Sequence, residues 1–185
     1  MEQGRLFYVI GRSGVGKDTV LRGVRTLLGC TVAHRYITRA ANDGHENHIA
    51  LSEDEFLLRQ QRGAFLLDWE AHGNYYGIGV EVRHWMDHGL AVFVNGSRQH
   101  LEQARQRLGA QMVSVLIDAT PEICRQRLHA RGRESCPEIN VRMQRELIDV
   151  SRVDWVIDNS GPLPATLKAI NHMWQQERQQ QGVMF

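Results

Sequence analysis

The feature that most constrains this chain is a short apolar run that leads into a glycine-rich loop. Leu6–Ile10 is apolar, β-prone and followed by a glycine, so we expect a buried strand there. The loop Gly11-Arg-Ser-Gly-Val-Gly-Lys-Asp18 nearly matches the pattern G-x-x-x-x-G-K-[ST], and a helix is expected from about Lys17 to Leu28. Glycines let successive N–H groups turn toward one anion, and the helix N-terminus adds partial positive charge. A strand, such a loop and a helix in this order predict an α/β domain of the P-loop NTPase class.

The same loop predicts how a nucleotide is held. We expect backbone amides to surround the terminal phosphates of ATP, with the Lys17 ammonium reaching the β- and γ-oxygens. The residues that we assign to ATP binding are Gly11, Arg12, Ser13, Gly14, Val15, Gly16, Lys17, Asp18 and Thr19.

Asp18 departs from the loop pattern, because a Ser or Thr hydroxyl normally ligates Mg²⁺ at this position. A carboxylate is also a hard oxygen ligand, so Asp18 is a candidate to bind the metal directly or through water. The Thr19 hydroxyl could take that place instead. Asp18 would then only interact with the helix dipole.

Strands alternate with helices along most of the chain, which predicts a parallel sheet flanked by helices. Further strands are expected at Leu90–Val94, Met112–Ile117 and Trp155–Ile157, and Thr31–Thr38 is a weaker candidate. Helices are expected over about 80–88, 97–108, 120–131, 135–149 and 164–179.

The segment from about residue 35 to 80 interrupts this alternation. Gly44–His48 is polar and loop-like, and Ser52 begins a capping box for a helix that ends near Gly63. Residues 64–69 and 75–78 then form a short hairpin. We therefore expect a single domain with a core of 1–34 and 80–185 that carries a small insertion at about 35–80.

Composition limits the partners of this domain. A chain of 185 residues with a formal net charge of +1 gives no bulk signal for nucleic acid, and no run approaches the roughly 18 apolar residues of a membrane span. Cys30, Cys124 and Cys136 are widely spaced, which favours reduced thiols in a cytoplasmic protein. Twenty of the 22 basic residues are Arg, which reflects either genomic base composition or a phosphate-rich ligand.

Several blocks resemble guanylate kinases in order and spacing. They are the loop itself, Thr38-Arg39, Gly44 with Glu46, Gly63-Ala-Phe-Leu66, Tyr76-Gly77, Arg131-Gly-Arg133 and Val156-Ile-Asp-Asn159. This resemblance implies a core, an acceptor-binding insertion and an Arg-bearing lid at about 127–145. Side chains that recognise guanine in that family are largely missing, however, since Ile78 replaces a Ser or Thr. The second arginine that binds phosphate in guanylate kinases is also absent.

A closer resemblance is to the ribose 1,5-bisphosphate phosphokinases of phosphonate catabolism. It rests on His34-Arg-Tyr-Ile-Thr-Arg39, Glu46-Asn-His-Ile-Ala-Leu-Ser52 and Val94-Asn-Gly-Ser-Arg98. The resemblance implies that ATP and ribose 1,5-bisphosphate give ADP and 5-phosphoribosyl 1-diphosphate. The alternative enzyme is a guanylate or other nucleoside monophosphate kinase. The alternative without catalytic activity is a guanylate-kinase-like module that binds protein partners.

For a small phosphorylated sugar as acceptor, five residues are candidates: Arg35, Arg39, Glu46, Tyr76 and Asn95. Guanidinium forks match phosphate geometry, and an amide can bind a sugar hydroxyl or phosphate without adding repulsion. Each also has a structural alternative, such as a solvated charge or an aromatic that covers the core.

The lid resemblance assigns catalysis to Arg131 and Arg133 together with Lys17, since such arginines stabilise the transferring phosphoryl group. Arg127 has the helical spacing to join them, and Arg142 and Arg145 could add to the lid from the next helix.

Overall fold

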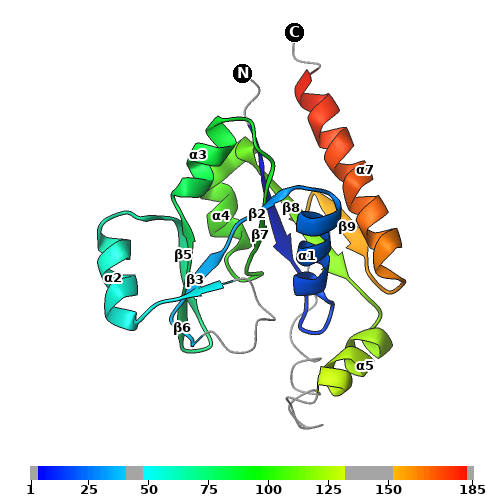
Figure 1. Ribbon diagram of the computed structural model, residues 1–185, viewed down its shortest axis with the longest axis horizontal. Helices are drawn as coiled ribbons and strands as arrows, with labels where there is room; N and C mark the ends of the chain where they lie inside the picture. The colour runs from blue at the N-terminus through cyan, green and yellow to red at the C-terminus, as the bar shows by residue number, and fades with distance from the viewer. Residues whose placement is uncertain (1–3, 41–47, 132–151, 183–185) are drawn as a thin grey trace.

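The computed structural model describes residues 4–40, 48–131 and 152–182 of the chain (Figure 1). Its main sheet has five strands in the order β2-β7-β1-β8-β9, and every neighbouring pair in it is parallel. The strands are β2 (Thr31–Val32), β7 (Val92–Asn95), β1 (Leu6–Ile10), β8 (Met112–Asp118) and β9 (Trp155–Asp158). Because β7 and β8 lie on either side of β1, the carboxyl end of β1 opens at a switch point, where ligands bind in open α/β sheets.

Helices cover both faces of this sheet, as predicted. Alternate residues of β1 enter two different cores: Phe7 and Val9 pack toward α1 (Lys17–Leu27) and α7 (Leu163–Gly182), while Leu6, Tyr8 and Ile10 pack toward the other face. That face is covered by α3 (Glu81–Asp87) and α4 (Leu101–Leu108), which is followed by the short η1 (Gly109–Gln111). Helix α5 (Pro121–Arg131) lies at the end of the sheet that carries the glycine loop, and the amino end of β1 and the carboxyl end of α7 lie at the opposite end (Figure 1).

A second sheet has four strands in the order β4-β3-β6-β5. They are β4 (His48–Ala50), β3 (Arg35–Ile37), β6 (Asn74–Gly79) and β5 (Phe65–Ala71), and α2 (Glu53–Gln61) packs on them. Phe56 of α2 is fully buried and stacks on Phe65 with ring centroids 4.5 Å apart. Ser52 caps α2 by accepting a hydrogen bond from the Glu55 amide, as the sequence predicted.

Two expectations for this region were wrong. Thr31–Thr38 is not one strand, because β2 ends at Val32 within the main sheet and β3 begins at Arg35 in the second sheet. His48 does not belong to a loop, since it begins β4 and pairs in register with Arg35. The expected helix at 135–149 lies outside the described residues.

None of the helices described here is long and apolar enough to cross a membrane. Cys30 and Cys124 are buried free thiols. Cys136 lies outside the described residues.

Candidate active site

The glycine loop connects β1 to α1 and has little room for side chains. Gly14 and Gly16 have φ values of 84° and 91°, in the left-handed region that favours glycine. A Cβ on Gly14 would lie 2.9 Å from the Cys124 carbonyl oxygen, and one on Gly16 would lie 2.9 Å from Asn159 Nδ2. Glycine is therefore required here both by backbone conformation and by the close approach of neighbouring segments.

The two cations of the loop have different partners. Lys17 Nζ donates to the carbonyl oxygens of Gly11 at 2.8 Å and Arg12 at 3.4 Å, so the ammonium lies along the loop. Arg12 Nη2 instead donates to Asp118 Oδ1 at 3.0 Å and to the Ala119 carbonyl at 3.2 Å. The Arg12 side chain thus ties the loop to the carboxyl end of β8.

A cavity of about 220 Å³ opens between the loop and the second sheet. It brings Arg35, Tyr76 and Asn95, all proposed from sequence to bind the acceptor, to the same space as the loop. Trp69, Ala71, His72, Gly96 and Ser97 complete its lining together with Arg12, Ser13, Gly14, Gly16, Lys17 and Asp18.

Arg35 projects from β3 into this cavity and rests on an aromatic stack. Its Cζ lies 5.5 Å from the centroid of the Tyr76 ring, and that ring stacks on Trp69 at 5.5 Å with an angle of 3° between the planes. Burial lowers the pKa of Arg35 below its ordinary value, while the nearby Asp18 carboxylate acts to raise it. The stack holds a desolvated cation at the cavity wall, where an anionic ligand would compensate its charge.

Asp18 and Asn95 meet across the cavity. Asn95, buried at the carboxyl end of β7, donates from Nδ2 to Asp18 Oδ1 at 3.0 Å. The amide oxygen of Asn95 is buried and has no hydrogen-bond partner within the described residues. Nor do those residues contain a group of three His, Cys, Asp or Glu side chains that could hold a metal on their own. This geometry suits a cation held by few protein oxygens and mainly by phosphate and water.

A second cavity of about 310 Å³ lies on the other side of the loop. Its walls come from α5, from the loop, and from the turn that follows β9, and its lining residues are Gly14, Gly16, Thr19, Arg127, Ala130, Asn159, Gly161 and Leu163. Thr19 therefore faces a different space from Asp18.

Arg127 and Asn159 fasten the loop from this side. Arg127 donates to the Val15 carbonyl at 3.0 Å and to the Asn159 carbonyl at 2.8 Å. Asn159 Nδ2 donates to the same Val15 carbonyl at 2.7 Å, and its Oδ1 accepts a 2.8 Å hydrogen bond from Thr166. The sequence grouped Arg127 with the lid arginines, but in the structure its guanidinium holds the main chain of the phosphate loop.

Arg39 and His48 lie near the first cavity but do not line it. Arg39 is exposed just beyond β3. Both ring nitrogens of His48 are buried without a hydrogen bond of normal geometry, beside the backbone of Arg39 and Ala40. Burial lowers the pKa of His48 below its ordinary value, and the charges of Arg39 and Arg35 lower it further, so the ring is neutral at pH 7.

Three predicted site residues cannot be placed in this geometry. Glu46 and Arg133 lie outside the described residues. Arg131 is the last residue of α5, but its side chain is not among those that the structure describes.

Comparisons with known proteins agree with this arrangement. A family model described as an AAA domain matches residues 8–148. The ribose 1,5-bisphosphate phosphokinase PhnN of Pectobacterium atrosepticum is 46% identical over 174 residues, which cover 91% of this chain and 93% of that protein. The chain belongs to the ribose 1,5-bisphosphate phosphokinase family. The PhnN of Desulfomicrobium baculatum is 48% identical over 165 residues and covers 86% of this chain and 88% of its own.

Among solved structures, the guanylate kinase of Anaplasma phagocytophilum superposes with a TM-score of 0.72 at 19% identity, covering 95% of this chain and 87% of that one. At this identity the likeness concerns the fold alone. The α/β fold with a parallel sheet, the P-loop class and the resemblance to this phosphokinase family are thus confirmed.

Sequence reasoning assigned no role to Trp69 or Asn159 of this phosphokinase. Trp69 reads as an ordinary strand residue, and only its stacking on Tyr76 connects it to Arg35. Asn159 closes a block that had been noticed for its resemblance to guanylate kinases, which was the available signal.

Proposed function

We propose that the chain transfers the γ-phosphoryl group of ATP to ribose 1,5-bisphosphate, giving ADP and 5-phosphoribosyl 1-diphosphate. The observation that carries this proposal is that one phosphate loop separates two cavities of different character. The names of the family members, at 46% and 48% identity, supply the identity of the acceptor.

The donor nucleotide is assigned to the cavity beside α5. The loop amides would hold its terminal phosphates, and Thr19 and the segment around Gly161 line the space that the rest of the nucleotide would enter. Because Arg127 and Asn159 hold the Val15 carbonyl, the amides of the loop stay oriented before ATP arrives.

The acceptor is assigned to the cavity beside the second sheet. Arg35 would form charge-assisted hydrogen bonds to one of its phosphates, the Tyr76 hydroxyl would donate to a phosphate, and the Asn95 amide oxygen would accept from a sugar hydroxyl. Arg39 and His48 extend this assignment toward the second phosphate, with His48 as a neutral partner that shares the β3–β4 register with Arg35. Glu46 is proposed to bind ribose hydroxyls. Residues 35–80 would thus form the acceptor-binding part of the domain.

The chemistry needs no general base. An oxygen of the acceptor's 1-phosphate is already anionic at pH 7 and attacks the γ-phosphorus. One phosphorus–oxygen bond forms, the bond to the β–γ bridging oxygen breaks, and ADP leaves with that electron pair. The work of the protein is to hold two anions together and neutralise their charge, which Lys17 does at the loop. Arg131 and Arg133 are proposed to add charge from a lid at about 127–145.

Magnesium fits the oxygen groups near the loop. Asp18 offers a carboxylate on the acceptor side, and the partnerless Asn95 amide oxygen lies beside it. When bound, the ion would neutralise charge on the ATP phosphates. The position of Asp18 in the first cavity favours it over Thr19 as the protein ligand.

A substrate comparison tests the proposal. Purified protein, ATP and Mg²⁺ would be incubated with ribose 1,5-bisphosphate, ribose 5-phosphate or GMP, and products would be followed by phosphorus NMR. We expect a new diphosphate signal together with ADP only from ribose 1,5-bisphosphate. Faster phosphorylation of GMP would replace the proposal with guanylate kinase activity. A Lys17→Ala preparation controls for contaminating kinases.

A further inference from the structure

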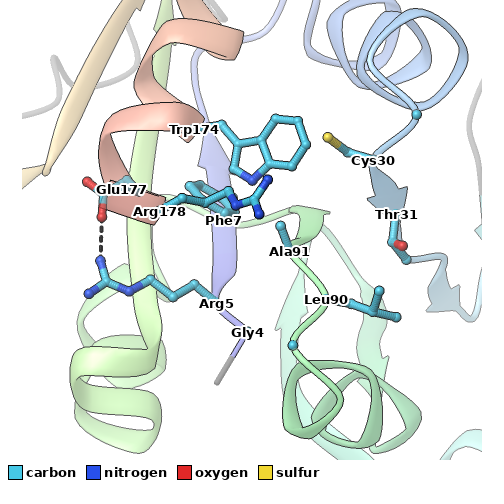
Figure 2. Close-up of a pocket in the computed structure, with 12 residues that line it drawn as sticks. Gly4, Arg5, Phe7, Cys30, Thr31, Leu90, Ala91, Trp174, Glu177 and Arg178 are labelled. Atoms are coloured by element: carbon cyan, nitrogen blue, oxygen red, sulfur yellow. Dashed lines mark hydrogen bonds and ion pairs between the residues drawn. The ribbon is translucent and has the colours of Figure 1, made fainter. Parts of the chain in front are cut away.

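A third cavity lies at the end of the main sheet opposite the phosphate loop (Figure 2). Its volume is about 230 Å³, and it shares no lining residue with the two cavities of the active site. Its walls come from the amino end of β1, the turn between α1 and β2, the segment that leads into β7, and α7. Nothing in the proposed reaction uses it.

The lining of this cavity is partly apolar. Phe7, Leu90 and Ala91 contribute carbon surface, and Phe7 is itself fixed by stacking on Phe93 at 4.6 Å. In Figure 2, Phe7 and Trp174 lie on one side of the space, with Cys30 and Leu90 on the other. Such a space accommodates a flat apolar group, and its size is below the roughly 300–1,000 Å³ of usual ligand pockets.

Trp174 and Arg178 supply hydrogen-bond donors to this cavity. The Trp174 indole nitrogen is buried and has no acceptor within the described part of the chain. A buried donor without a partner is unfavourable, and an acceptor on a ligand would relieve that cost. The Arg178 guanidinium lies 5.7 Å from the Trp174 ring, and no carboxylate among the described residues pairs with it.

The carboxylate in this cavity, that of Glu177, already has hydrogen-bond partners within the protein. Glu177 is buried, pairs with Arg5 and accepts a 2.5 Å hydrogen bond from the Trp155 indole (Figure 2 shows the Arg5 contact). Two arginines against this one glutamate leave the lining with a net positive charge. A ligand that satisfies the free donors must therefore bring an acceptor and is favoured if it is an anion.

We infer that this cavity is a binding site for a small planar carboxylate. Its carboxylate would accept hydrogen bonds from Trp174 Nε1 and Arg178, and its flat apolar part would lie against Phe7 and Leu90. A carboxylate is favoured over free phosphate because phosphate would leave the apolar lining without a partner, whereas the flat apolar part of a carboxylic acid anion would cover it.

The site is tested by titrating the full chain with benzoate and following the indole N–H resonance of Trp174 by NMR. The Trp174→Phe variant identifies that resonance. Benzamide, which has the same shape without the charge, and inorganic phosphate serve as comparison ligands. We expect a saturable shift of the Trp174 signal with benzoate and weaker responses to the other two.

Arg178→Gln tests the charge without disturbing the core, since Arg178 is exposed. Loss of one charge-assisted hydrogen bond should weaken benzoate binding about tenfold or more. Arg22→Gln is the matched control, because Arg22 is an exposed arginine on α1 outside the cavity. Phosphoryl transfer without benzoate should be unchanged in both variants.

Three results would overturn the inference. They are a Trp174 resonance that does not shift saturably with benzoate, equal affinity for benzamide, and equal weakening by Arg22→Gln and Arg178→Gln. Stronger binding of phosphate than of benzoate would mean that the cavity takes inorganic anions and not carboxylates. None of these results depends on the kinase assay, so the proposed reaction can stand or fall separately.

Discussion

Replacing Arg35 by Met should separate acceptor binding from stability. The side chain is enclosed by the second sheet and the phosphate loop, and burial lowers its pKa, so the free protein bears the cost of a desolvated cation. Methionine fills a similar volume without charge. We therefore expect a protein that folds and uses the acceptor poorly.

The magnitudes follow from the contacts. Methionine relieves the desolvation of the guanidinium, but it also removes the cation beside Asp18 and the contact with Tyr76 at 5.5 Å, which is worth roughly 1 kcal/mol. Because these effects oppose one another, we expect the free energy of unfolding to change by about 1 kcal/mol or less and Tm by about 4 °C or less. Losing two charge-assisted hydrogen bonds to phosphate costs about 3 kcal/mol or more, which is roughly a hundredfold in kcat/KM for the acceptor.

Arg59→Met is the matched control for this change. The Arg59 guanidinium also lies 5.5 Å from a tyrosine ring, that of Tyr36, but it pairs with Glu55 at 2.6 Å and lies outside the cavity. Thermal unfolding and a coupled ADP-release assay would be run on both variants. If Arg35→Met left the acceptor KM unchanged, or reduced acceptor use no more than Arg59→Met did, the role assigned to Arg35 would be refuted.

Four further predictions concern the loop and its surroundings. Lys17→Ala should abolish transfer with folding intact, and turnover within about tenfold of the wild type in the ADP-release assay would contradict its role. Asp18→Asn should raise the Mg²⁺ concentration needed for half-maximal rate, and an unaltered metal titration would move the ligand elsewhere. Arg127→Gln should raise the KM for ATP about tenfold, whereas the exposed Arg125→Gln should not. The pKa of His48 is lowered in the folded state, so as pH falls below 6.5 the unfolded chain binds a proton at this residue more readily and the free energy of unfolding decreases. His48→Gln should make this decrease smaller, as measured by urea unfolding at a series of pH values below 6.5.

The parts of the fold that depend on local pattern were predictable. Some features depend only on residues close by in the sequence, so the sequence predicts them directly. They are the apolar run of β1, the glycines at 14 and 16 and the helix cap at Ser52. The split between β2 and β3 was not predictable in this way. Only two residues separate the strands, and each strand is chosen by a distant partner, Phe93 for Val32 and Tyr76 for Ile37.

The same distinction applies to the site. Residues that touch phosphate belong to recognisable motifs, but those that hold the motif in place act over long separations. Arg127 reaches the carbonyl of Val15, 112 residues away, and Arg12 reaches Asp118, 106 residues away. No local rule distinguishes such an arginine from one on a solvated helix face, as the exposed Arg125 shows two positions earlier. The supporting residues therefore become evident only in the folded structure.

The placement of the two cavities constrains how the reaction can be controlled. Gly14 and Gly16 line both of them, so a ligand on either side contacts the same short piece of main chain. Arg127 and Asn159 hold that piece from the donor side through the Val15 carbonyl, while Asn95 holds Asp18 from the acceptor side. Weakening the donor-side contacts should therefore affect acceptor use as well as ATP binding. If Arg127→Gln raised the KM for ATP and left the acceptor KM unchanged, the two sites would bind their ligands independently. The shared main chain of the loop would then transmit no coupling free energy between them.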